Sequence, residues 1–184
     1  MSGENQLQEI VYEGYGPGGV AIIVHTITDN KNRTASNMRH IFTKYGGDMG
    51  QTGSVSWIFK RKGVIIVDAE KYNYDTVESL VFETSAEDIE LDGTTVSITT
   101  SPEDLLDITS TLQEKDIRPE MSELEYIAEN DIEITDFEKV LKLTKMLEAF
   151  DEDEDVESVS SNEEISEELQ TEVDEFIEKN TFRT

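Results

Sequence analysis

The sequence contains no cysteine, so disulfides, thiolate metal ligands and cysteine nucleophiles are all excluded. It also lacks any run near the roughly 18 apolar residues of a membrane helix, so we expect no membrane partner. The polar stretch 1–8 has neither the apolar core of a signal peptide nor an Arg-rich transit pattern. These absences favour a reducing compartment, and we expect a cytoplasmic protein.

Basic residues are scarce and unevenly distributed. The chain has 15 Lys and Arg against 42 Asp and Glu, a net charge of −27. Residues 1–62 contain seven bases and five acids, whereas residues 63–184 contain the other eight bases and 37 acids. Phosphate contacts need Lys and Arg, so the average charge argues against nucleic-acid binding. The asymmetry indicates different partners for the two parts, or one anionic partner met by one face only.

The first third of the chain predicts a β-hairpin followed by a helix. Strands are expected at 9–13 and 20–28, and the glycine-rich run 14–19 joins them as a turn. Helical periodicity follows over 30–45, where the apolar positions are Met38, Ile41, Phe42 and Tyr45. Residues 53–60 then alternate between apolar and polar side chains, which predicts a third strand. The run Lys60–Gly63 is expected to turn into a fourth strand at 64–68, giving a hairpin over 53–68.

The remainder predicts four further strands and three helices. Asp92-Gly93 is a strong two-residue hairpin signal, and Ser101 with Pro102 marks a helix start. The expected helices are 75–84, 102–115 and a segment after 135; the expected strands are 88–91, 95–99, 123–128 and 156–160.

This order predicts an α+β protein built from two small ferredoxin-like split βαβ domains, the second inserted into the first. The first domain is expected to be discontinuous, over 8–70 and 132–162, and the inserted domain to span 71–131. An acidic tail with a helix is expected over 163–184. Residues 148–178 hold 15 acids and no base, yet they keep a helical stripe of Ile165, Leu169, Val173 and Phe176. Ser161 and Glu164 fit a capping box, and both a mobile tail with a transient helix and a docked helix remain open.

No catalytic or metal-binding set is recognisable, and we expect neither an enzyme nor a cofactor. His25 is interpreted as a structural residue of a strand, and His40 has no Ser–Asp pair at a familiar spacing. Asp151, Asp153 and Asp155 imitate the start of a calcium loop, but Val156 and Asn162 occupy the positions of its glycine and glutamate. A solvated acidic linker is the favoured interpretation.

Two segments are candidates for contact with phosphates. The turn Gly16–Gly19 lacks the GK[ST] ending of a phosphate loop and joins two strands, so a tight structural turn is favoured. The helix 30–45 has an apolar face and an opposite face that holds Arg33, His40 and Lys44, with Arg39 at its flank. A solvated helix face gives the same pattern, but a face without Asp or Glu is unusual in so acidic a chain. We expect it to contact RNA or DNA phosphates, extended by the turn Lys60-Arg61-Lys62 if the fold brings them together.

Ordered motifs run along most of the chain: Tyr12-Glu13-Gly14-Tyr15-Gly16-Pro17-Gly18-Gly19-Val20-Ala21, Thr28-Asp29-Asn30-Lys31-Asn32-Arg33-Thr34, Arg39-His40, Lys44, Gly46-Gly47, Gly53-Ser54-Val55-Ser56-Trp57, Phe59, Ala86-Glu87-Asp88, Pro102-Glu103-Asp104, Lys139–Leu143 and Ser161-Asn162. They resemble the YebC/PmpR family, whose mitochondrial relatives are translational activators of cytochrome oxidase subunit one. The resemblance covers about residues 8–162. Family members have an N-terminal helical basic domain and two α+β domains, one inserted in the other. The resemblance begins almost at the first residue, so we expect this sequence to lack the N-terminal helical domain.

The resemblance implies a non-enzymatic regulator of gene expression, either a translation factor on ribosomes or RNA or a DNA-binding transcriptional regulator. The implied partners are therefore the ribosome, RNA or DNA, and a full-length relative, with no small-molecule substrate. The alternative is a truncated paralogue that acts as a protein-interaction module through its acidic domains. A small-molecule regulatory domain is a weaker idea that rests on fold analogy. The expected nucleic-acid or ribosome contacts are Gly16, Pro17, Gly18, Gly19, Asn30, Lys31, Asn32, Arg33, Arg39, His40, Lys44, Lys60, Arg61 and Lys62.

Overall fold

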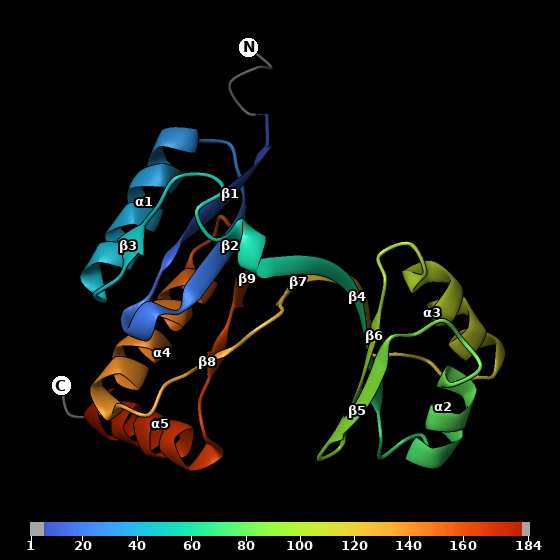
Figure 1. Ribbon diagram of the computed structural model, residues 1–184. Helices are drawn as coiled ribbons and strands as arrows, with labels where there is room; N and C mark the ends of the chain where they lie inside the picture. The colour runs from blue at the N-terminus through green and yellow to red at the C-terminus, as the bar shows by residue number, and fades with distance from the viewer. Residues whose placement is uncertain (1–5, 182–184) are drawn as a thin grey trace. The chain divides into compact units, whose positions relative to one another are not determined.

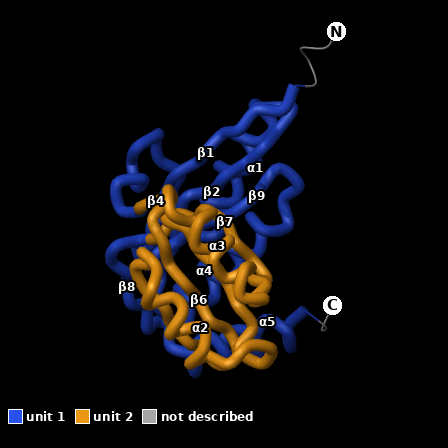
Figure 2. Tube along the Cα trace, turned by 90° about the vertical axis from the view of Figure 1, so that its right-hand side faces the viewer, with its two compact units in different colours: residues 1–59, 128–184 blue, residues 60–127 orange. Residues whose placement is uncertain are grey.

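The protein was analysed as a computed structural model that describes residues 6–181 (Figure 1). The first five residues of the polar N-terminal stretch and the last three of the expected acidic tail lie outside the described residues. The chain forms two compact units. Unit 1 contains residues 1–59 and 128–184, and unit 2 contains residues 60–127 (Figure 2). The sequence predicts domain boundaries at 70/71 and 131/132. In the structure, unit 2 begins at Lys60 and ends at Ile127.

Unit 1 contains a four-stranded antiparallel sheet in the order β3-β1-β2-β9. Its strands are β1 (Gln8–Tyr15), β2 (Ala21–Thr28), β3 (Asp48–Met49) and β9 (Val156–Ser161). The helices α1 (Lys31–Lys44) and α4 (Phe137–Glu152) share one hydrophobic core with the sheet. Ile22 and Val24 enter this core from β2, because alternate residues of a strand point to the same face, and Val20 enters it from the residue before the strand.

The expected acidic tail is docked on unit 1. Two residues, β10 (Glu163–Glu164), pair in parallel with β8 (Ile132–Glu133). Helix α5 (Glu167–Thr181) then packs on α4, where Val173 is fully buried and Phe176 lies edge-on to Phe137 with ring centroids 5.6 Å apart. The expected capping by Ser161 and Glu164 is wrong. Ser166 Oγ accepts the N–H of Leu169 instead, so the helix begins later.

Unit 2 has the element order β4, α2, β5, β6, α3, β7 and a sheet in the order β5-β6-β4-β7. Both helices lie on one side of this sheet in Figure 1 and bury Ile65, Val67, Val96 and Ile98 beneath them. The expected hairpin at Asp92-Gly93 is confirmed. Its elements are β4 (Phe59–Asp68), α2 (Tyr74–Val81), β5 (Asp88–Asp92), β6 (Thr95–Thr100), α3 (Leu105–Glu114) and β7 (Met121–Ala128).

The predicted hairpin over 53–68 is wrong. Residues 50–55 form a loop, the short 3-10 helix η3 (Ser56–Ile58) follows, and one continuous strand, β4, runs through the expected turn at Lys60–Gly63. The expected order of the first domain fails with it, since β1 lies between β2 and β3 in the sheet. Helix α3 also starts three residues late. Asp104 is its N-cap, and the Asp104 N–H donates to Ser101 Oγ at 3.2 Å.

The prediction of a mixed α and β chain is confirmed, and the ferredoxin-like assignment of the inserted domain stays a prediction. Among residues 6–181, no helix combines the length and apolar character required to cross a membrane.

Candidate nucleic-acid interface

The exposed side of helix α1 carries bases and neutral side chains but no acid. Its start is fixed by Asn30, whose side-chain oxygen accepts the N–H of Arg33 at 3.1 Å, an ordinary N-cap. Thr34, Met38, Ile41 and Phe42 are buried against the sheet. The 14 residues of the helix include Lys31, Arg33, Arg39 and Lys44 and no acid. The exposed side therefore carries positive charge in a strongly negative chain.

The outer side of α1 contains a shallow hollow of about 490 Å³. The structure brings the predicted residues Asn32, Arg39 and His40 together around it, with neutral neighbours Ala35, Ser36 and Thr43. Lys31 and Lys44 are exposed at the two ends of the helix. Guanidinium, imidazole, amide and hydroxyl groups can all donate hydrogen bonds, so the hollow suits an anionic or acceptor-rich surface.

The guanidinium of Arg33, one of the predicted contacts, is paired with two carboxylates of the protein. It lies 3.0 Å from Asp155 Oδ1 and 3.2 Å from Asp29 Oδ1. Asp155 is nearly buried and also accepts a hydrogen bond from Thr34 Oγ1 at 2.8 Å. The hydrogen bonds to Asp155 raise the pKa of Arg33 above its ordinary value. Arg33 thus ties the start of α1 to the segment between α4 and β9.

The glycine turn lies beside the end of α1. Pro17–Gly19 form the 3-10 turn η2, in which Gly18 and Gly19 have φ of +81° and +80°, values that favour glycine. Gly16 and Pro17 are buried, whereas Gly18 and Gly19 are exposed. A Cβ on Gly47 would lie 3.2 Å from the Cα of Gly16, so the turn and the loop after α1 are in close contact. The structure therefore places Gly16 next to the loop that follows α1.

Helix α4 adds a basic residue that sequence reasoning missed. Lys142 is exposed, and its Cδ would lie 3.8 Å from a Cβ on Gly46, directly after α1. Its signal was present in the sequence, because it lies opposite the apolar stripe of the helix expected after residue 135. We name the set Arg39, His40, Lys44 and Lys142, together with the turn Gly16–Gly19, the basic strip.

The predicted bases Lys60, Arg61 and Lys62 belong to unit 2, on strand β4. Lys60 and Arg61 are exposed. Lys62 Nζ is bonded to Glu87 Oε2 at 2.7 Å, so its charge is matched locally. Their continuity with the surface of α1 stays a prediction.

Trp57 lies in a different environment from the one that the sequence predicts. It was expected on the apolar face of a strand, but its side chain is 73% exposed. The indole N–H donates to the Ser54 carbonyl at 3.0 Å, which limits rotation of the ring. An exposed, oriented tryptophan is a surface on which a nucleic-acid base can stack.

A buried carboxylate holds the loop that carries Trp57. Glu13, 4% exposed on β1, accepts the backbone N–H groups of Gly53, Val55 and Ser56 at 2.7, 3.0 and 2.7 Å. Burial alone would raise the pKa of Glu13, but these hydrogen bonds to the charged form outweigh burial and lower it. In the sequence, the one indication that Glu13 matters was its place in the motif Tyr12–Ala21, which resembles the YebC/PmpR family.

Within the described residues, no three His, Asp or Glu side chains are arranged to hold a metal ion. Asp155, from the segment that imitates a calcium loop, is instead bonded to Arg33 and Thr34.

Residues 7–163 match the family model of the TACO1/YebC second and third domain. Among curated proteins, a probable transcriptional regulatory protein of Persephonella marina is 45% identical over 90% of this chain and 67% of its own length. One of Treponema denticola is 43% identical over 87% and 64%. A crystal structure of a conserved hypothetical protein from Aquifex aeolicus has a TM-score of 0.84 and 39% identity, covering 89% of this chain and 67% of that one. The chain spans about two thirds of the length of these relatives.

Proposed function

The chain belongs to the TACO1/YebC family, and from this premise we propose that it is a non-enzymatic regulator of gene expression that binds RNA, with ribosomal RNA as the main target. Binding uses the basic strip of unit 1. The proposal keeps duplex DNA as a competing ligand, since the names of the relatives refer to transcription. In this proposal its action is positioning and electrostatic.

The observation that carries the proposal is the charge of α1. The helix holds four bases and no acid, in a chain with almost three times as many acids as bases. Arg39 and Lys44 are exposed, and neither has an ion pair among the described residues. A free cation can release condensed counterions from a phosphate backbone, which is the main source of nucleic-acid affinity. The large net negative charge opposes approach, so binding is expected to be weak and strongly salt-dependent.

Single-stranded RNA fits better than duplex DNA. Trp57 offers a stacking surface that requires an unpaired base, and bases in single strands are accessible to it. The hollow beside Arg39 and His40 is a second feature of unit 1 that an extended single strand can follow.

The experiment is co-sedimentation with ribosomes and fluorescence anisotropy with single-stranded RNA and duplex DNA, at about 50 and 200 mM salt. The double variant Arg39→Glu plus Lys44→Glu should abolish binding. The control, Lys115→Glu plus Arg118→Glu, makes the same change in charge within unit 2 and should retain it. Binding that ignores both salt and the first double variant contradicts the proposal, and a preference for duplex DNA redirects it to transcription.

A second function is supported by unit 2. Its helices α2 and α3 carry four acids and no base, and Phe82 and Leu106 are 74% and 77% exposed. The hydrogen bond from Ser85 Oγ to Asp104 Oδ2 joins the segments that carry these two apolar side chains. Such a surface suits a basic protein segment with an apolar anchor. Recovery of a bound protein that survives RNase and is lost in Phe82→Ser plus Leu106→Ser supports this function.

A further inference from the structure

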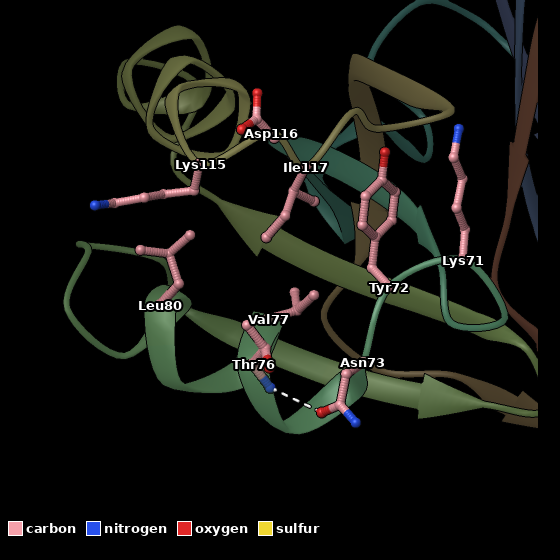
Figure 3. Close-up of a pocket in the computed structure, with 9 residues that line it drawn as sticks. All are labelled: Lys71, Tyr72, Asn73, Thr76, Val77, Leu80, Lys115, Asp116 and Ile117. Carbon is pink, nitrogen blue, oxygen red and sulfur yellow. Dashed lines mark hydrogen bonds between the residues drawn. The ribbon is translucent and has the colours of Figure 1, made fainter.

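Unit 2 contains a pocket of about 450 Å³ between the start of α2 and the end of α3. This volume is typical of small-molecule sites. Its floor consists of Val77 and Ile117, which are 0% and 5% exposed. Figure 3 shows Leu80 and Ile117 pointing into the space above Val77, with the ring of Tyr72 standing beside them. The interior is therefore apolar, with one aromatic wall.

The rim of the pocket is basic, in contrast to its surroundings. Unit 2 has 17 acids and six bases, yet two of the bases, Lys71 and Lys115, line this pocket. They lie at opposite ends of the group in Figure 3. The acid in the lining, Asp116, has its carboxylate directed away from Leu80 and Val77 in the same view. The local charge therefore favours an anion.

One end of the pocket has the donors that a carboxylate needs. The side chains of Tyr72 and Lys71 run in the same direction in Figure 3, and the Lys71 ammonium is 5.6 Å from the centre of the Tyr72 ring. The Tyr72 hydroxyl accepts the N–H of Arg118 at 3.0 Å, which orients the phenol and leaves its own proton to donate. Ammonium and hydroxyl protons together match the oxygens of a carboxylate.

We propose that this pocket binds a small amphipathic carboxylate, an aliphatic or aromatic acid whose apolar body covers Val77, Leu80 and Ile117 and whose carboxylate meets Lys71 and the Tyr72 hydroxyl. The site shares no residue with the basic strip, since all its residues belong to unit 2 and the basic strip belongs to unit 1. The aliphatic part of Lys115 closes the other end, as lysine stems commonly cover apolar surface. This site adds a ligand class that the sequence did not predict.

The test compares three probes that share a benzyl group by NMR titration of the full chain: the anion phenylacetate, its neutral isostere phenylacetamide and the cation benzylamine. Phenylacetate is expected to saturate amide shifts around residues 71–80 and 112–118, with a dissociation constant on the order of 1 mM, as for other ligands of about ten heavy atoms. Phenylacetamide should bind about tenfold more weakly because it lacks the charge, and benzylamine should not saturate. Equal responses to the three probes, or no saturable shift, overturn the proposal.

Variants separate charge from shape. Lys71→Gln should weaken phenylacetate about tenfold while leaving phenylacetamide unchanged, and Lys71→Arg should keep most of the affinity. Arg61→Gln makes the same change in charge elsewhere in unit 2 and should have no effect. Tyr72→Phe should reduce the preference for phenylacetate over phenylacetamide. The proposal is wrong if Lys71→Gln binds phenylacetate as well as Arg61→Gln does, in variants whose spectra show an intact fold.

Discussion

Each unit places helices over a four-stranded sheet, yet helix α1 of unit 1 is opposite in charge to both helices of unit 2. Helix α1 of unit 1 has four bases and no acid, whereas α2 and α3 of unit 2 together have four acids and no base. The buried residues are similar in kind, since each core contains aliphatic side chains from alternate strand positions. Architecture therefore leaves the outer helix surface free to vary, and function must be assigned from that surface.

The units also differ in their buried polar groups. In the described part of the chain, unit 1 buries Glu13, Asp155 and Asn162 and three threonines, whereas the corresponding group in unit 2 is a single threonine, Thr100. Each buried carboxylate in unit 1 receives hydrogen bonds from a segment distant in sequence. Hydrogen bonds of this kind specify one arrangement of loops, because leaving such groups unpaired is costly.

The largest expected effect concerns the unit 1 core. Phe150 is fully buried and lies 5.0 Å from Phe42 between ring centroids, so Phe150→Ala should lower the free energy of unfolding by about 3–5 kcal/mol. Urea denaturation measures the loss of stability, and native-state hydrogen exchange shows which unit loses protection. The counterpart in unit 2 is Ile98→Ala, with an expected loss of about 2–5 kcal/mol. If each variant lowers amide protection in both units equally, the chain unfolds as one body and the contrast between units does not extend to stability.

Glu13→Gln should cost about 2 kcal/mol, because the amide offers N–H groups where the loop needs an acceptor for its own N–H groups. Trp57 is the one tryptophan in the sequence, so its fluorescence reports directly on this loop. Because the ring is already 73% exposed, the expected change in the variant is a lower anisotropy of this emission, from freer rotation of the indole. An unchanged anisotropy and unfolding midpoint would mean that the loop is held by other contacts.

The pH dependence should have opposite signs in the two units. The lowered pKa of Glu13 gives stability that is present above the ordinary Glu value of about 4.3 and is lost as pH falls through the folded-state pKa. In unit 2, burial and then the nearby Glu123 raise the pKa of Glu125. That contribution is present at low pH and is lost as pH rises through the raised pKa. Hydrogen exchange at pH 7 and pH 4 measures both effects. Glu13→Gln should reduce the difference in amide protection of unit 1 between the two pH values, and Glu125→Gln should increase amide protection of unit 2 at pH 7.

The docking of α5 predicts a smaller loss. Val173 is fully buried against unit 1, so Val173→Ala should lower the free energy of unfolding by about 1–2 kcal/mol. Phe82→Ser in unit 2 provides the control, since its side chain is 74% exposed and the expected change is under about 0.5 kcal/mol. Thermal unfolding measures both. A Val173→Ala protein as stable as Phe82→Ser would indicate that α5 does not stay docked in solution.

The smallest effect concerns a single cation. Arg39→Gln should weaken RNA binding about threefold and reduce the slope of log affinity against log salt by about 0.7. Arg33→Gln should leave that slope unchanged, because its guanidinium is already paired with Asp155 and Asp29. Anisotropy titrations over several salt concentrations compare the two. If both variants reduce the slope alike, Arg33 also meets phosphate and the present assignment of the basic strip is incomplete.

Much of the fold follows from local patterns. The hairpin β1–β2, helix α1, the Asp92-Gly93 hairpin and helix α4 all occur where periodicity and turn residues predicted them. These signals succeed because a helix or a hairpin is determined largely by neighbours within a few residues. The basic surface of α1 was equally visible, since it depends on one helix and its 3.6-residue period.

Tertiary contacts decided the rest. Residues 53–60 alternate as a strand should, but Glu13 binds three N–H groups of this segment from about 40 residues away and folds it into a loop that exposes Trp57. The sequence gives Arg33 no ion-pair partner at helical spacing on α1, but the fold brings Asp155, 122 residues later, within hydrogen-bonding distance of it. By itself the sequence determined the family, the mixed fold and the base-only helix, because these reside in local order and composition. Only folding brings distant groups within hydrogen-bonding distance. These contacts decide which cations stay unpaired, how the Trp57 loop is held and where a pocket forms.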